Sequence, residues 1–342
     1  MKWKCMSAAL SGLLVAAPGA WAAGFAIWTY DGDKAGDALG RSVARLGDVN
    51  GDGVPEVVAG APLNEGRVQV HNGATGTRIW TRSGPDPFSD SFGWSVAGVG
   101  DVDGDGIPDV GATAPSYQAP FDTFARGRAY ILSGATGATI CQWEAASELT
   151  LYGQVIDGVL DTDASGVNDV AVGAPIEGPG GVVHVYSGSS CAEIWTIAGT
   201  ANSPVGSAVS AAGDIDGDSR DDVLVGSAGN DTVAPDAGAA FVYSKLPLLP
   251  FGVPIMSWFG ENNGDFFGTS VVGLRRNVAG GPDLDVVIGA PYFDNGALSN
   301  SGKAYLYSGG TLVYERYGGA DDQNFGSAVA NAGDATGDGV RD

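Results

Sequence analysis

The chain has 342 residues and a formal net charge of -23. So acidic a protein repels the phosphates of nucleic acid, which excludes a nucleic-acid-binding function. Although 56 residues are glycine, 44% are hydrophobic and the apolar runs recur regularly, which indicates a globular all-β protein with many tight turns.

The N-terminus has the pattern of a secretory signal. Lys2 and Lys4 precede an apolar run at 8–17, and Ala20-Trp21-Ala22 supplies the small residues that a signal peptidase recognises. The apolar run is too short to span a bilayer as a helix, and no later segment is long and apolar enough to do so. We therefore predict a signal peptide over residues 1–22 and a protein that is secreted, extracellular or at the cell surface, with the periplasm as a further location.

One short phrase recurs along the rest of the chain. Its fullest copy, Phe92-Gly93-Trp94-Ser95-Val96-Ala97, is followed by an acidic stretch at 100–110. The copies start near residues 39, 92, 152, 205, 267 and 325. A near-constant period of this length indicates structural repeats whose loops vary in length around a fixed core.

Each repeat is predicted to contain four strands. In the first repeat they cover residues 42–46, 57–61, 67–71 and 78–81, and turns rich in glycine and asparagine separate them. No amphipathic helical pattern follows the signal. Four short antiparallel strands per repeat predict one blade of a β-propeller, and the blades must stack around an axis because a single blade cannot bury both faces of its sheet.

Two motifs of these repeats resemble those of a known family. They are the Phe-Gly pair at the repeat start, as in Phe92-Gly93, and the Gly-Ala-Pro at the end of the second strand, as in Gly60-Ala61-Pro62. Both resemble the FG-GAP repeats of the integrin α-subunit N-terminal propeller, over nearly all of the chain after the signal. The resemblance implies a β-propeller that is seven-bladed when complete. It also implies calcium loops between the first two strands of several blades, and ring closure by a strand from the N-terminus. We expect a secreted member of bacterial type.

The two ends of the chain bear on that closure. The segment at 25–30 contains Ile27-Trp28 and resembles fourth strands such as Ile79-Trp80, so it is predicted to be an orphan fourth strand. The sequence stops at Asp342, inside the sixth acidic loop. We therefore expect a propeller domain over 23–342 with about five full blades plus partial ones, truncated at its C-terminus.

An acidic loop of constant spacing follows the first strand of most repeats. Oxygen-bearing side chains occupy positions one, three, five and nine of the loop, and glycine at position six permits the positive φ of a sharp turn. Calcium (Ca2+) takes about six to eight oxygen ligands, which such a loop supplies from alternate residues and from the backbone carbonyl at position seven. We predict up to five Ca2+ sites. Their ligands, loop by loop, are Asp48, Asn50, Asp52, Val54 and Glu56; Asp101, Asp103, Asp105, Ile107 and Asp109; Asp161, Asp163, Ser165, Val167 and Asp169; Asp214, Asp216, Asp218, Arg220 and Asp222; and Asp334, Thr336, Asp338, Val340 and Asp342.

The spacing of these loops differs from that of an EF-hand. An EF-hand needs an acid at position twelve and flanking helices, whereas the second loop has Ala112 there and strands on both sides. A run of ordinary Asp turns, closed by side-chain hydrogen bonds, is the remaining alternative. Ser219 replaces the glycine of the fourth loop and is expected to cost some affinity. In the fifth repeat Leu274-Arg275-Arg276 replaces the acids, so no Ca2+ is expected there.

Two cysteines remain once the signal is removed. Cys141 and Cys191 fall in neighbouring repeats at non-equivalent positions. An oxidising compartment would allow them to pair, but sequence cannot show whether they approach each other. Between a disulfide and two small packed residues, the positions favour the second.

The sequence lacks the signatures of common enzymes. No Gly-x-Ser-x-Gly elbow, His-Glu-x-x-His motif or phosphate loop occurs. His71 and His184 stand at non-equivalent positions of third strands, which predicts packed or solvated residues and no metal pair. We predict no catalytic residue and no enzyme, with an acidic glycosidase-like pair left as the alternative.

The connections between strands are predicted to divide between two faces of the ring. The acidic loops and the turns between strands three and four share one face, and the longer, variable connections share the other, where recognition tends to lie. Aromatic residues on those connections are candidates for partner binding, with capping of the blade cores as the alternative. They are Phe88, Tyr117, Phe121, Phe124, Tyr292 and Phe293.

These features together predict a calcium-binding, non-catalytic scaffold for adhesion or recognition, whose partner is an extracellular protein or glycan. Two alternatives stay open. One is a carbohydrate-binding or accessory module of an extracellular hydrolase, and the other is a structural segment of a larger cell-surface protein.

Overall fold

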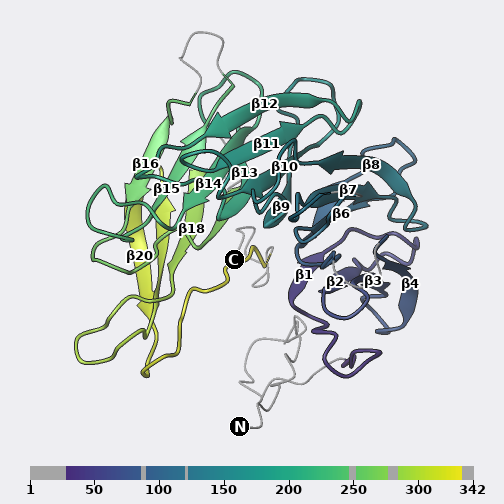
Figure 1. Cartoon of the computed structure of the whole chain (residues 1–342), viewed down its shortest axis with the longest axis horizontal. Coiled ribbons are helices and arrows are strands. Elements are labelled where there is room, and N and C mark those ends of the chain that lie inside the picture. Colours follow the sequence, from purple (N-terminus) through teal and green to yellow (C-terminus); the bar gives the residue numbers. More distant parts are fainter. Residues whose placement is uncertain (1–27, 86–89, 120–121, 246–251, 276–283, 333–342) are drawn as a thin grey trace.

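The computed structural model describes residues 28–85, 90–119, 122–245, 252–275 and 284–332 (Figure 1). Within these ranges the chain forms strands and turns and no helix. The strands make five antiparallel sheets, each of four strands in sequence order. These are the blades that the repeats predict.

The strand bounds follow the repeat pattern closely. The first three blades contain β1 (Ser42–Arg45), β2 (Val57–Ala61), β3 (Arg67–His71) and β4 (Arg78–Ser83); β5 (Val96–Gly100), β6 (Asp109–Ala114), β7 (Arg128–Leu132) and β8 (Thr139–Glu144); and β9 (Val155–Val159), β10 (Asp169–Ala174), β11 (Val182–Tyr186) and β12 (Glu193–Ala198). The last two contain β13 (Ala208–Gly213), β14 (Asp222–Ser227), β15 (Ala239–Tyr243) and β16 (Met256–Phe259); and β17 (Ser270–Arg275), β18 (Leu284–Ala290), β19 (Lys303–Ser308) and β20 (Thr311–Tyr317).

The blades follow one another around an arc, from β1 to β20 in Figure 1. The first strand of each blade contacts the first strand of the next, in the order β1, β5, β9, β13 and β17. This arrangement places the first strands at the centre and the fourth strands outside, as in a β-propeller. The all-β propeller predicted from the repeats is thus confirmed.

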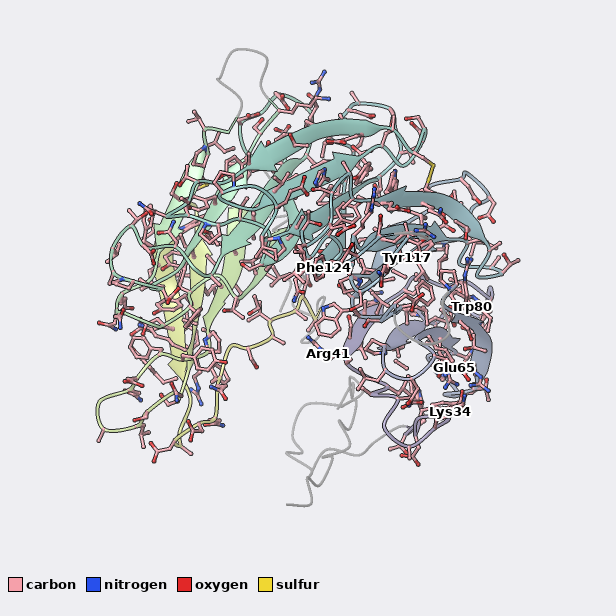
Figure 2. The ribbon with its side chains drawn as sticks, in the orientation of Figure 1. Lys34, Arg41, Glu65, Trp80, Tyr117 and Phe124 are labelled. Carbon is pink, nitrogen blue, oxygen red and sulfur yellow. A yellow bond between two sulfur atoms is a disulfide. The ribbon has the colours of Figure 1, made fainter. Side chains whose placement is uncertain are left out.

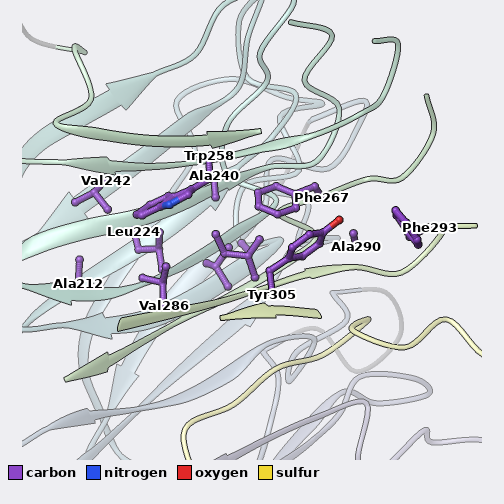
Figure 3. Close-up of a cluster of buried hydrophobic side chains, with 13 residues drawn as sticks. Ala212, Leu224, Ala240, Val242, Trp258, Phe267, Val286, Ala290, Phe293 and Tyr305 are labelled. Carbon is purple, nitrogen blue, oxygen red and sulfur yellow. The ribbon is translucent and has the colours of Figure 1, made fainter. Parts of the chain in front are cut away.

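The hydrophobic core lies between blades. Figure 3 shows one such cluster, in which Leu224 and Ala240 of the fourth blade pack against Val286 and Tyr305 of the fifth. Leu224 and Val286 are fully buried, because they lie between the facing surfaces of the fourth and fifth sheets. Truncating a buried leucine such as Leu224 to alanine costs about 2–5 kcal/mol.

Glycine at the end of the second strand permits close contact between blades. A Cβ atom on Gly60 would lie 1.9 Å from the carbonyl oxygen of Gly93, at the start of the next blade. Gly289 stands in the same relation to Gly326, also at 1.9 Å. The glycine of the Gly-Ala-Pro motif therefore permits close approach of neighbouring backbones.

Tryptophans of the fourth strands bind the following blade. The indole nitrogen of Trp80 donates to the carbonyl oxygen of Gly134 at 2.7 Å, in the turn between β7 and β8. Trp28, which precedes the first blade, donates to Gly73 at 2.9 Å, in the turn between β3 and β4. Trp28 thus contacts blade 1 as Trp80 contacts blade 2, which is the position expected of a fourth strand. Residues 25–27 of the predicted orphan strand lie outside the described residues.

Cys141 and Cys191 form a disulfide, with their Cα atoms 5.7 Å apart, visible as a yellow bond in Figure 2. The sequence favoured two packed residues, so that interpretation was wrong. Its error was to expect partners at equivalent positions. Neighbouring blades meet through non-equivalent ones, the fourth strand of one blade and the turn between strands three and four of the next. Cys141 lies in β8 and Cys191 in that turn before β12.

Candidate metal centres

The acidic loops are built from consecutive side-chain-to-backbone hydrogen bonds. In the second loop the carboxylate of Asp101 accepts from the backbone N–H of Gly104 at 2.8 Å and of Gly106 at 2.9 Å. Asp105 then accepts from the N–H of Ile107 at 2.8 Å. The Asp105 bond reaches two residues ahead and closes an Asx turn, and the two Asp101 bonds curl the rest of the loop around that carboxylate.

The other described loops repeat this geometry. The position-one carboxylates of Asp48 and Asp161 accept from the glycine N–H at position six, each at 2.7 Å. In the fourth loop Ser219 replaces that glycine, and its N–H reaches Asp214 at 3.0 Å. Ser219 adopts a φ of 67°, close to the 83–85° of the glycines it replaces. The loop therefore keeps its shape, at the cost of a strained backbone at Ser219.

The acid at position nine is buried beneath each loop. These residues are at most 1% exposed, and each accepts from the backbone N–H of position two at 2.6–2.9 Å. They are Glu56, Asp109, Asp169 and Asp222. The other oxygen of Asp109 accepts from Gly134 in the turn between β7 and β8, at 2.9 Å. Position nine thus joins the acidic loop to the turn on the same face of the ring.

Burial raises the pKa of these carboxyls. The pKa of Asp109 and that of Asp169 rise to about 6, and that of Asp222 rises to about 7, chiefly through desolvation. Negative neighbours add to the effect, as Asp103 and Asp105 do at Asp109. A cation among these oxygens would favour the ionised form of each carboxyl and offset this cost.

Four groups of acids bring their oxygen atoms together. Within each group the ligand atoms lie within 4.8 Å of one another. The groups are Asp48, Asp52 and Glu56; Asp101, Asp103 and Asp109; Asp161, Asp163 and Asp169; and Asp214, Asp216 and Asp218. Carboxylate oxygens without histidine or cysteine form a donor set that fits a hard divalent cation such as Ca2+. The residues present therefore fit the predicted metal.

The loops differ in the side chains that could bind a metal ion. In the fourth loop Asp222 lies outside the group, with its Oδ2 held by the N–H of Ile215 at 2.8 Å. In the third loop the hydroxyl of Ser165 stands where the other loops have an aspartate, and it accepts from the N–H of Val167 at 3.3 Å. The last predicted loop lies outside the described residues, with Asp334, Thr336, Asp338, Val340 and Asp342.

The opposite face carries the aromatic candidates for partner binding. Phe124 is 51% exposed and Tyr292 is 48% exposed, so both are accessible. Tyr117 and Phe293 are buried, which supports core capping for these two. Phe88 and Phe121 lie outside the described residues.

The two buried rings lie beneath cations that the sequence analysis missed. The Arg128 guanidinium lies 3.5 Å from the ring centre of Tyr117, and the Lys303 ammonium lies 4.8 Å from that of Phe293. Each cation is the first residue of a third strand. The sequence pattern that could have revealed these cations is a basic residue directly after a glycine in an otherwise acidic repeat, as in Gly127-Arg128 and Gly302-Lys303.

The two histidines are packed residues, as predicted. His71 is buried, with its ring 4.2 Å from that of Tyr30. His184 lies 3.0 Å from a carboxylate oxygen of Glu177 and makes an edge contact with Tyr152.

No helix in the described part of the chain is long and apolar enough to cross a membrane.

Known proteins share this repeat. The family model described as an FG-GAP-like repeat matches residues 48–112, which include the first two acidic loops. The chain is 33% identical to integrin alpha-4 of Xenopus laevis over 159 residues, which is 42% of this chain and 15% of the relative. It is 30% identical to integrin alpha-V of Gallus gallus over 236 residues, 62% of this chain and 21% of the relative.

Integrin alpha-8 of Gallus gallus is 30% identical over 241 residues, 65% of this chain and 22% of that relative. The chain thus spans 15–22% of the length of these relatives. The five four-stranded blades, the repeat motifs and the matched segment agree with one another. This chain carries FG-GAP repeats and forms a β-propeller like that of the integrin α subunits.

Proposed function

We propose that the protein is a non-catalytic scaffold for adhesion or recognition, whose acidic loops bind Ca2+ and whose partner is an extracellular protein or glycan. The observation that carries the proposal is the recurrence of one geometry in four blades. In each, carboxylate oxygens gather within 4.8 Å on a loop that a buried acid anchors. A single acidic turn would be ordinary, but four at one structural position favour a common ligand.

The proposed role of the ion is to hold the blade together. When bound, Ca2+ supplies positive charge among carboxylates that otherwise repel one another. Two residues of the chain also hold the blade together, because Asp109 and Asp169 accept hydrogen bonds that join the loop to the turn between strands three and four. Extracellular Ca2+ modules have dissociation constants of about 0.1–1 mM. A site filled at a hundred times its dissociation constant adds about 2.7 kcal/mol of stability.

We further propose that residues 1–22 are a signal peptide, that 23–342 is the propeller domain, and that the protein acts outside the cytoplasm. The disulfide between Cys141 and Cys191 supports this location, because such bonds persist in oxidising compartments. The similarity to integrin α subunits supports an extracellular partner.

Thermal unfolding tests the metal proposal. We expect millimolar Ca2+ to raise the melting temperature well above that in chelator, and magnesium to raise it less. Asp101→Ala removes the carboxylate that closes the second loop and should weaken the calcium response. Asp31→Ala removes one exposed carboxylate outside the loops and should leave the response unchanged. Equal melting temperatures with Ca2+ and with chelator would mean that the loops are ordinary Asp turns.

A further inference from the structure

The four acidic loops that the structure describes touch one another around the ring. Position eight of each loop lies against the chain at the start of the loop before it. Between the third and fourth loops, the N–H of Asp221 donates to the carbonyl oxygen of Asp161 at 3.1 Å. Between the second and third loops, the side-chain amide of Asn168 donates to the carbonyl oxygen of Val99 at 3.3 Å. Neighbouring loops are therefore in direct contact.

Packing makes the same contact between the first and second loops. A Cβ atom on Gly47, which directly precedes the first loop, would lie 2.5 Å from Cγ of Pro108, which is position eight of the second loop. The ring of Pro108 therefore lies against the backbone at Gly47, where no side chain would fit. A backbone hydrogen bond, a side-chain hydrogen bond and a packing contact thus join the loops at the same place in three successive pairs.

A second row of contacts joins the buried acid of one loop to the buried acid of the next. Val102, at position two of the second loop, is 4% exposed, and its N–H donates to Asp109 at 2.9 Å. Its side chain lies against Gly188 in the turn of blade 3, where an added Cβ atom would be 3.1 Å from Cγ1 of Val102. The N–H of Gly188 donates to Asp169 at 3.2 Å. The path from Asp109 to Asp169 therefore passes through only two residues.

The first and second loops are joined in the same manner. Val49, at position two of the first loop, is buried, and its N–H donates to Glu56 at 2.6 Å. A Cβ atom on Gly134 would lie 3.3 Å from Cγ1 of Val49, and the N–H of Gly134 donates to Asp109 at 2.9 Å. Because Asp109 also accepts from Val102, hydrogen bonds and packing connect the first three loops without interruption.

These contacts have two opposing consequences for cations in neighbouring loops. Closing one loop around a cation fixes its position-two residue, which supports the turn of the next blade and lowers the entropy cost of closing the next loop. Charge acts in the opposite direction, because one bound cation reduces the negative charge that attracts the next. Most residues of the loops are exposed or half-buried, and salt at physiological strength screens exposed charges beyond about 8 Å. Packed contacts are not screened, so their effect should prevail.

We propose that neighbouring acidic loops bind Ca2+ with positive cooperativity, which the contacts at positions two and eight transmit from blade to blade. The inference rests on the proposed calcium function and adds how its sites are regulated. Because the contacts join neighbours, the second loop should be coupled to the third more strongly than to the fourth. Coupled loops would fill over a narrower range of calcium concentration than independent ones.

Calorimetric titration of the full chain with Ca2+ tests this when chosen loops are silenced. Two aspartates of a loop are replaced by asparagine, which removes two charges and keeps the side-chain oxygens that accept the N–H groups of the loop. Melting in chelator checks that each variant folds. The substitutions, loop by loop, are Asp48→Asn and Asp52→Asn; Asp101→Asn and Asp103→Asn; Asp161→Asn and Asp163→Asn; and Asp214→Asn and Asp216→Asn. The last predicted loop is silenced in every protein by Asp334→Asn and Asp338→Asn.

The comparison is between a neighbouring and a separated pair of active loops. With the second and third loops active, the product of the two binding constants should exceed the product of the single-loop values by about tenfold. With the second and fourth loops active, it should equal that product within about twofold. Added salt should increase the excess for the neighbouring pair, because salt screens the repulsion between cations and leaves the contacts in place.

A pair of valine variants tests the contacts themselves. Val102→Ala removes the contact with Gly188 but keeps the N–H that reaches Asp109, so it should lower the excess at least about threefold. Val209→Ala is the matched control, because Val209 is also 4% exposed but lies on β13, outside the loops. Its variant should keep the excess.

The outcomes separate this inference from the calcium function. A neighbouring pair whose binding constants multiply to the single-loop product or less would overturn cooperativity and leave calcium binding intact. An equal loss of the excess in both valine variants would also overturn it, because the contacts would then not transmit the coupling. Single-loop proteins that take up no Ca2+ at millimolar concentration would reject the calcium function together with the cooperativity.

Discussion

At the scale of single residues, cations join neighbouring blades. Lys303 is 2% exposed, and its ammonium lies 2.6 Å from Glu261 of the preceding blade and 2.8 Å from Glu315 of its own. Burial alone lowers the pKa of Lys303, but hydrogen bonds to the two carboxylates raise it above its usual value. Arg67 is also buried and pairs with one carboxylate, that of Asp33, at 3.1 Å. The buried charge of Lys303 is tolerated because carboxylates on both sides compensate its desolvation.

The half-buried carboxyl of Asp157 should make stability depend on pH. Burial raises the pKa of Asp157, on the inner strand β9, to about 7, although the N–H of Gly158 and the hydroxyl of Ser210 oppose the shift. Because the folded-state pKa is raised, Asp157 contributes stability below its ordinary pKa, and that contribution is lost as pH rises through about 7. In saturating Ca2+ the melting temperature should therefore fall between about pH 6 and pH 8, by about 2–4 °C for each kcal/mol lost.

Asp157→Ser provides the comparison. Serine occupies the same position in the next blade, at Ser210, so the variant is compatible with the fold. Its melting temperature should change less between these pH values than that of the original chain. Parallel pH profiles for the two proteins would show that Asp157 does not titrate in this range.

The sequence could predict which acids gather in each loop, because they are local, while their role as metal ligands stays a prediction. Constant spacing within nine residues places Asp101, Asp105 and Asp109 in one loop, whatever the rest of the fold does. The burial of Tyr117 depends instead on Arg128, which reaches it from another strand. Contacts of this kind follow from sheet pairing, so the spacing of residues in the sequence does not reveal them.

At the scale of elements, one contact recurs at the junctions between neighbouring blades, and different residue types make it at different junctions. The strand register gives Trp80, Cys141 and Met256 the same position in their fourth strands. Their partners on the third strands are Val70, Ile131 and Val242. In the next blade each of these fourth-strand residues meets the turn residue with positive φ. Those residues are Gly137, Cys191 and Gly310, with φ of 72°, 57° and 84°. The disulfide thus replaces a side chain packed on glycine.

This equivalence predicts how the disulfide can be exchanged. The double variant Cys141→Trp, Cys191→Gly should recreate the Trp80–Gly137 contact and retain much of the stability. Cys141→Ala, Cys191→Ala leaves neither a crosslink nor a packed ring. A crosslink that closes a loop of this length contributes about 4 kcal/mol, so the alanine variant should melt well below the original chain.

Melting temperatures of the two double variants, measured side by side under oxidising conditions, test the exchange. The Trp-Gly variant should melt between the original chain and the alanine variant. If it melts below the alanine variant, the two contacts are not equivalent. The reduced original chain serves as the control, because it should resemble the alanine variant.

The repeat period predicted the strands almost to the residue. Residues 57–61 and 67–71 agree with β2 and β3, because alternation and glycine turns delimit them. The fourth strand extends to Ser83, beyond the predicted end at residue 81, because pairing with β3 continues to Arg67. The end of a strand thus depends on how far its partner strand continues, and the apolar pattern of a single segment carries no information about its partner.

At the scale of the whole molecule, the segment before the first blade is part of the propeller. Trp28 binds the turn at Gly73, and its ring packs against Gly76. The carboxylate of Asp33 accepts from Arg67, Gln69 and Arg78 at 2.6–3.1 Å. These contacts fix the segment to the outer part of blade 1, through β3 and β4.

Trp28→Ala should therefore destabilise the protein about as much as Trp80→Ala does. Both indoles are partly buried and donate one hydrogen bond across a junction, so we expect a loss of roughly 2–3 kcal/mol in each variant. Denaturant unfolding in saturating Ca2+ measures both. Thr29→Ala, at an exposed neighbour, is the control and should be nearly neutral. A neutral Trp28→Ala would mean that the segment is not anchored by the indole.

The placement of all the described acidic loops on one face has an electrical consequence. Without cations, the loops concentrate the negative charge of their carboxylates on that face of the ring. Every cation bound to a loop would reduce this charge. A positively charged surface would therefore attract the loop face more strongly when the loops hold no cation. Calcium would then set how strongly that face is attracted as well as how firmly the ring holds together.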